Sequence, residues 1–100
     1  MSQLNIKIPR TMDDNAGYFL LSVRCENGLI ETIHKRESSE SVGFSKTLIN
    51  CSKMMYKDIG YGEGSIKNLK DYETPSDWTS VIMGSSKSDL VNFICLNYRG

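Results

Sequence analysis

Three cysteines and a single histidine are the side chains in this sequence best suited to chemistry. Cys25, His34, Cys51 and Cys95 could together supply four zinc ligands. Zinc sites usually contain close pairs such as C-x2-C, whereas eight, sixteen and forty-three residues separate successive candidates here. A catalytic cysteine needs a neighbouring base, and nothing near any cysteine would activate it. We therefore predict no metal site, no catalytic residue and no cofactor, and hence a non-enzymatic protein.

The simpler interpretation of the same residues is structural. The cysteines would be core thiols or would form a disulfide. A histidine among strand residues is usually a half-exposed surface group, and we expect this of His34.

A glycine-rich stretch at residues 60–65 (GYGEGS) resembles a phosphate-binding loop only superficially. It lacks the lysine and the following apolar helix of a P-loop, and its spacing is not G-x-G-x-x-G. Glu63 would also repel a phosphate group. We therefore predict an ordinary loop between two elements.

Four aromatic residues are the best candidates for a binding surface. They are Tyr56, Tyr61, Tyr72 and Trp78. Exposed aromatic side chains are typical anchors for a protein partner, although Trp78 could instead cover the core just before the C-terminal helix.

The charge balance bears on the class of partner. Twelve basic and twelve acidic residues give zero formal net charge, and the basic run at residues 34–36 is followed at once by Glu37. Nucleic-acid binders usually carry a basic excess or stripe, so we predict a protein partner and no nucleic acid. No apolar run approaches the ~20 residues of a membrane span. The oligomeric state stays open, a homodimer included.

A β-hairpin is the clearest local signal. Residues 18–26 and 29–36 are rich in β-forming side chains and flank Asn27-Gly28, the preferred pair for a two-residue type I′ turn. This turn places Arg24 opposite Glu31, Cys25 opposite Ile30 and Leu21 opposite His34. One face then carries Phe19, Leu21, Val23, Cys25 and Ile30, with Thr32 and His34 beside them, and we predict that it faces the core.

Further strands are predicted on both sides of the hairpin. Residues 44–51 and 54–61 indicate a second strand pair, joined by a loop longer than two residues because Ser52-Lys53 is a poor turn. Alternating apolar residues within residues 1–16 indicate a tail or an edge strand, which Pro9 ends. Residues 65–80 are polar and irregular.

A helix is predicted at residues 87–97. A serine of the preceding Gly84-Ser85-Ser86 would cap it, and Asp89 in its first turn suits the helix dipole. Leu90, Val91, Ile94 and Cys95 form one apolar stripe, which Tyr98 extends. The fold class is therefore α+β: one domain over residues 1–100, with an antiparallel sheet of four to six strands and one C-terminal helix packed on it.

From residue 41 to residue 95 the order of features resembles the bacterial surface-adhesin protein E-like family. The resemblance rests on TLINC followed by the tyrosine strand MMYKDIGYGEGS, on the irregular stretch that reaches Trp78, and on the helix SSKSDLVNFIC. It implies an antiparallel sheet whose C-terminal helix is tethered by a disulfide between Cys51 and Cys95. It also implies a secreted or lipid-anchored protein, and some members bind host matrix proteins. Cys25 lies outside the pattern.

The strand and helix patterns agree with that pairing. Cys51 ends a strand whose Thr47 and Ile49 share its face, and Cys95 lies on the apolar stripe of the helix. We predict that the two are neighbours, bonded if the protein matures in an oxidising compartment, with Cys25 left as a buried thiol.

Two compartments, and two kinds of binding protein, fit the sequence. Residues 1–15 contain no apolar signal core, so the protein is periplasmic or on the cell surface if a signal peptide has been removed, and cytoplasmic otherwise. The first case suits an adhesin-like binding domain. The second suits a small protein that neutralises a specific partner, such as an immunity protein or a phage-defence inhibitor.

Overall fold

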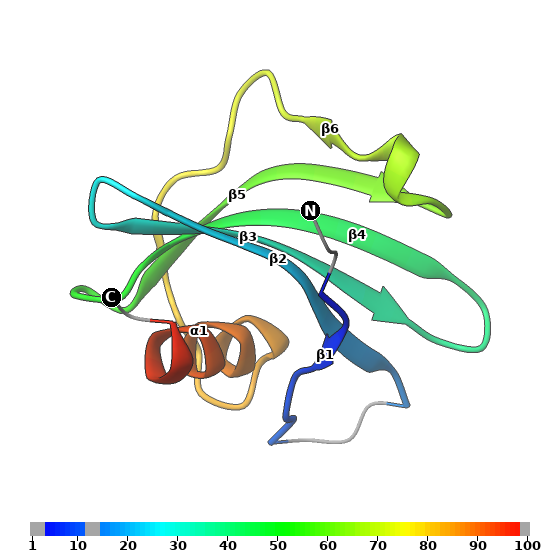
Figure 1. The fold of residues 1–100 in the computed structure, drawn as a ribbon, viewed down its shortest axis with the longest axis horizontal. Helices are drawn as coiled ribbons and strands as arrows, with labels where there is room; N and C mark the ends of the chain where they lie inside the picture. Colours follow the sequence, from blue (N-terminus) through cyan, green and yellow to red (C-terminus); the bar gives the residue numbers. More distant parts are fainter. Residues whose placement is uncertain (1–3, 12–14, 99–100) are drawn as a thin grey trace.

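Four long strands form the centre of an antiparallel sheet that arches over a single α-helix (Figure 1). The computed structural model describes residues 4–11 and 15–98. In chain order the elements are β1 Ile6–Lys7, β2 Gly17–Glu26, β3 Leu29–Glu37, β4 Val42–Asn50, β5 Met55–Glu63, the 3-10 turn η1 Ile66–Asn68, β6 Lys70–Asp71, β7 Thr79–Ser80 and α1 Ser86–Asn97. The strands lie in the order β1-β2-β3-β4-β5-β6, and β7 also pairs with β5. The predicted α+β class is confirmed.

The hairpin β2–β3 turns where the sequence predicts. Asn27 and Gly28 have φ of 53° and 79°, as a type I′ turn requires at both positions. Arg24 pairs with Glu31 and Cys25 with Ile30. The register next to the turn is therefore confirmed.

A β-bulge at Leu21 makes the rest of the predicted register wrong. Leu20 pairs with His34 and Ser22 with Ile33, so Leu21 has no partner across the ladder. An extra residue reverses the side-chain alternation of the strand beyond it. Tyr18 and Leu20, instead of Phe19 and Leu21, therefore share the face of His34 that the helix covers.

The glycine-rich stretch belongs largely to strand β5, so the prediction of a loop there is wrong. A Cβ atom at Gly62 would lie 2.4 Å from the backbone carbon of Asn68. The absence of a side chain lets η1 fold back against the strand. Gly64, with φ of 87°, makes the turn that follows.

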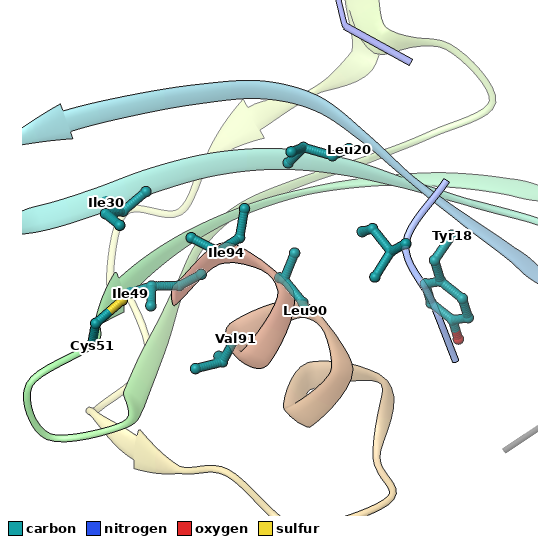
Figure 2. Close-up of a cluster of buried hydrophobic side chains, with 9 residues drawn as sticks. Tyr18, Leu20, Ile30, Ile49, Cys51, Leu90, Val91 and Ile94 are labelled. Atoms are coloured by element: carbon teal, nitrogen blue, oxygen red, sulfur yellow. The ribbon is translucent and has the colours of Figure 1, made fainter. Parts of the chain in front are cut away.

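The core lies between the sheet and the helix. Leu90, Val91 and Ile94 are 1%, 0% and 0% exposed, as predicted from the helical stripe. Figure 2 shows Leu90 and Ile94 pointing toward the sheet, where Leu20 and Ile30 meet them in one apolar cluster.

A disulfide joins the helix covalently to the sheet. The Cys51 and Cys95 sulfurs are 2.08 Å apart and the Cα atoms 5.6 Å apart. Cys51 directly follows β4, beyond the core residue Ile49, and its sulfur points at the last turns of α1 (Figure 2). The predicted proximity of the two cysteines is confirmed.

The first turn of α1 is fixed by two sets of hydrogen bonds. Ser85 is the N-cap, and its hydroxyl accepts the Ser88 N–H. The Asp89 carboxylate accepts hydrogen bonds from Arg10 Nε at 2.7 Å and from the Thr11 hydroxyl at 2.9 Å. Burial alone would raise the pKa of Asp89, but these bonds outweigh it and lower the pKa. The start of the helix is therefore tied to the segment that follows β1.

Candidate functional site

The three cysteines lie away from the histidine. Cys51 and Cys95 are bonded to each other, and Cys25 is a free, exposed thiol. The prediction of a buried Cys25 is wrong, because this residue lies near the hairpin turn beside the end of α1. There its sulfur meets the Tyr98 carbonyl oxygen at 3.8 Å.

The four aromatic candidates fall into separate places. Tyr56 and Tyr61 lie on the face of β5 that is turned toward the helix. Tyr72 follows β6 and is exposed. Trp78 precedes β7 and lies under the Lys57 ammonium, 5.0 Å from its ring centre. Since Lys57 points to the opposite side of β5 from Tyr56, the structure does not gather the four on one surface.

A small polar cavity of about 150 Å³ lies between the sheet and the start of α1. One row of pairs across three strands builds its floor: His34 pairs with Ser45, and Ser45 with Tyr61. Ser86 and Lys87, the first two residues of α1, line it from the helix side. We call this space the helix-start pocket.

Two β-bulges bring a tyrosine each into the helix-start pocket. The bulge at Leu21 turns Tyr18 to the helix side, and a second bulge at Ile59 does the same for Tyr61. Both tyrosines line the pocket. A Cβ atom at Gly43 would lie 2.7 Å from the Tyr61 hydroxyl oxygen, so a glycine is needed for this position of the ring. Bulges commonly redirect side chains beside functional sites.

His34 is the least expected member of the pocket. Its side chain is buried, 6% exposed, so the expectation of a half-exposed surface group is wrong. Its Nδ1 atom is buried without a hydrogen-bond partner among the residues that the structure describes. Burial, and then the charge of Lys87, lower its pKa to about 4, although Asp58 acts in the opposite direction. The ring is therefore neutral at pH 7.

The charged groups around His34 are partly paired. Lys87 Nζ contacts the Asp58 carboxylate at 2.7 Å, and the Lys87 ammonium also lies 5.0 Å from the centre of the Tyr56 ring. Arg36 Nε donates to the Tyr18 hydroxyl at 3.2 Å. The pocket therefore offers several hydrogen-bond donors around one neutral imidazole.

The pKa of His34 limits the acid–base chemistry of the pocket at neutral pH. A general base works best when its pKa lies near the working pH, and that of His34 is about 4. No cysteine lines the pocket. Over residues 4–11 and 15–98, no group of three or more His, Cys, Asp or Glu side chains could hold a metal ion.

Sequence reasoning missed most of this pocket. The sequence patterns identify none of four lining residues as a candidate site residue: Arg36, Ser45, Ser86 and Lys87. The one available signal is the alternation along residues 30–34, which places His34 on the same face as Ile30. The bulges that add the tyrosines have no sequence signature.

Comparisons with known proteins give no relative to which this pocket can be compared. No family model, curated protein or solved structure matches the chain. No helix in the described part of the chain is long and apolar enough to cross a membrane.

Proposed function

We propose that this protein is a non-enzymatic domain that binds a protein partner in an oxidising compartment, in the periplasm or on the cell surface, in the manner of protein E-like adhesins. The observation that carries the proposal is the disulfide between Cys51 and Cys95. Disulfides persist in secreted and periplasmic proteins and are rare in the cytosol. A tether from strand to C-terminal helix is also what the resemblance to that family implies.

The tether has a clear physical purpose in so small a domain. The helix supplies three of the residues that close the core, and the sheet alone would leave one face without cover. Closing a loop across a sequence separation of 44 residues lowers the entropy of the unfolded chain, which corresponds to about 4 kcal/mol in the chain-entropy model. The stability of small domains is typically 5–15 kcal/mol, so this contribution is large.

Binding is favoured over catalysis by the chemistry of the helix-start pocket. His34 has a pKa too low for an efficient general base at neutral pH. Cys25 and Cys51 line a different hollow, at the opposite end of the hairpin. A cysteine–histidine pair therefore does not form, and the pocket remains a set of donors.

Exposed apolar side chains in the turn before α1 give a partner something to contact. Ile82 and Met83, in the turn that precedes α1, are 73% and 94% exposed. Tyr61, at 41% exposed, is on the pocket's rim. Flexible methionine and amphipathic tyrosine side chains are common at binding surfaces. We place the partner's footprint across this turn and Tyr61.

The compartment is tested by counting thiols. Protein is isolated from its native cell without reductant and unfolded. One sample is alkylated with iodoacetamide directly and a second is alkylated after reduction, and the mass of each is measured. The proposal expects one alkyl group before reduction, on Cys25, and three afterwards. A Cys25→Ser variant serves as control and should carry none before reduction.

The opposite result has a defined meaning. Three alkyl groups before reduction would show that the cysteines are free in the cell. The cytoplasmic alternative, a small protein that neutralises a specific partner, would then replace the proposal.

A further inference from the structure

The N-terminus of α1 opens into the helix-start pocket with donors that the fold leaves unused. The first backbone N–H groups of any α-helix have no partner within the helix. Ser85 caps the Ser88 N–H, whereas the N–H groups of Ser86 and Lys87 find no acceptor in the described part of the chain. Helix N-termini of this kind favour anions through both these donors and the helix dipole.

His34 provides a second and independent indication of a ligand. A buried polar atom without a hydrogen bond costs roughly 1–3 kcal/mol, so most such atoms are satisfied in folded proteins. Nδ1 of His34 is an exception, and its side chain is 6% exposed and lines the pocket. An acceptor brought within hydrogen-bond distance of Nδ1 would remove this cost.

The polar residues that line the pocket come from five elements, with Tyr18 contributed by β2. Arg36 (β3), Ser45 (β4), Tyr61 (β5) and the first two residues of α1 border the same small space. Donors that converge from several directions suit a group with several acceptor oxygens. The volume of the pocket, about 150 Å³, is well below the ~300–1,000 Å³ of pockets for drug-sized ligands, so the bound group must be small.

The charged groups around His34 do not prevent an anion from binding there. Lys87 and Asp58 form an ion pair and largely cancel each other. The Tyr61 hydroxyl donates to the Glu63 carboxylate at 3.5 Å, but Glu63 is exposed, so water screens its charge. The Arg36 guanidinium donates Nε to the Tyr18 hydroxyl and has no carboxylate partner in the contacts described. The Asp89 carboxylate, in the first turn of α1, is engaged by Arg10 and Thr11.

We infer that the helix-start pocket binds a small tetrahedral oxyanion of the sulfate or phosphate class, held by Arg36, the ring of His34 and the N–H groups of Ser86 and Lys87. This inference goes beyond the proposed function and does not depend on the compartment. The ligand is either a free ion or the terminal phosphoryl or sulfo group of a larger molecule. An anion beside His34 favours the protonated imidazole, so binding is coupled to proton uptake.

The test uses the fact that His34 is the only histidine. Its ring signals are followed by NMR while sodium sulfate replaces sodium chloride at constant ionic strength. Sulfate is chosen because its charge does not change over the pH range. The expected result is a saturable shift of the His34 ring signals together with a higher His34 pKa at saturation.

Matched variants separate the pocket from general attraction of anions. Arg36→Gln should weaken sulfate binding about tenfold, as expected for loss of a charged hydrogen-bond donor. Lys53→Gln, in the exposed turn after β4, removes the same charge elsewhere and should change binding less than about twofold.

The backbone donors can be tested separately at Ser86. Proline is well tolerated at the first helical position, and the φ of −80° and ψ of 161° at Ser85 suit a residue before proline. Ser86→Pro removes the N–H and the hydroxyl, whereas Ser86→Ala removes only the hydroxyl. The proline variant should bind sulfate more weakly than the alanine variant, with the amide spectrum of α1 preserved in both.

Two results would overturn the inference. One is a His34 response to sulfate that does not saturate or that chloride reproduces. The other is equal sulfate affinity in Arg36→Gln, Ser86→Pro and Lys53→Gln. If sulfate binds, its affinity is compared with that of O-phosphoserine, a phosphate monoester. Tighter binding of O-phosphoserine would show that the natural ligand is a phosphoryl group attached to a larger molecule. Tighter binding of inorganic sulfate would show that it is a free ion.

Discussion

His34 makes the stability of this protein depend on pH in a predictable direction. Its pKa is about 4 in the folded state, against the ordinary 6.5 in an unfolded chain. Between these values the unfolded state binds a proton that the folded state does not, so the free energy of unfolding falls as the pH falls from 6.5 to 4. The total loss is roughly 3 kcal/mol, and it is complete below pH 4.

This prediction is checked by urea unfolding at pH 7 and at pH 4.5. The wild-type protein should lose most of that stability, whereas a His34→Gln variant, which cannot titrate there, should lose much less. The lowered pKa of Asp89 acts separately, because its stabilisation is lost only as the pH falls further, from the ordinary value of 3.8 through its lowered folded-state pKa. Equal losses in the wild type and the variant would contradict the burial of His34.

Single residues were the hardest part to predict from the sequence. The alternation along residues 29–36 places His34 on the core side, but only the strands and helix packed over it decide that it is buried. Cys25 shows the converse error. Cys25 lies on the face of β2 that is turned toward α1, but the helix ends before covering it.

At the scale of elements, α1 contributes to the core through a narrow stripe. Leu90 is 1% exposed and packs in the cluster between helix and sheet, whereas Leu96, on the same helix, is 85% exposed. Leu90→Ala should lower the free energy of unfolding by roughly 2–5 kcal/mol. Leu96→Ala should change it by less than about 0.5 kcal/mol. Thermal or urea unfolding measures both, and similar small losses would mean that the helix is peripheral.

Long elements with local signals were predictable, and interruptions within them were not. Asn27-Gly28 marks its turn because few other residues adopt positive φ at both positions, and the serines before α1 mark its cap. The bulges at Leu21 and Ile59 have no comparable signature. They depend on how the whole sheet twists over the helix, yet they decide that Tyr18 and Tyr61 reach the helix-start pocket.

For the whole molecule, the disulfide and the core hold the same two layers together. A Cys51→Ala/Cys95→Ala double variant should lose roughly 2–5 kcal/mol of unfolding free energy relative to the oxidised protein. Because the Cys25 thiol is free and exposed, Cys25→Ser should lower the free energy of unfolding by less than about 0.5 kcal/mol. Urea unfolding without reductant compares the three proteins. A loss no greater in the double variant than in Cys25→Ser would show that the tether adds nothing to stability.

The same arrangement links the fold to the site. The cap at Ser85 and the Asp89 contacts to Arg10 and Thr11 fix one end of α1, and the disulfide fixes the other. The helix start is thereby held over His34, so the pocket exists before any ligand arrives. A site formed in advance loses less conformational freedom on binding.

The burial of His34 beneath the start of α1 is tested most directly by the pKa of its ring, measured by NMR on the oxidised protein in chloride without sulfate or phosphate. Since the sequence contains one histidine, a single titration curve reports it. Burial beneath the start of the helix and the neighbouring Lys87 charge predict a midpoint of about 4. A midpoint at or above 6.5 would contradict it, since the ring would then be solvated and the helix-start pocket would not exist as described.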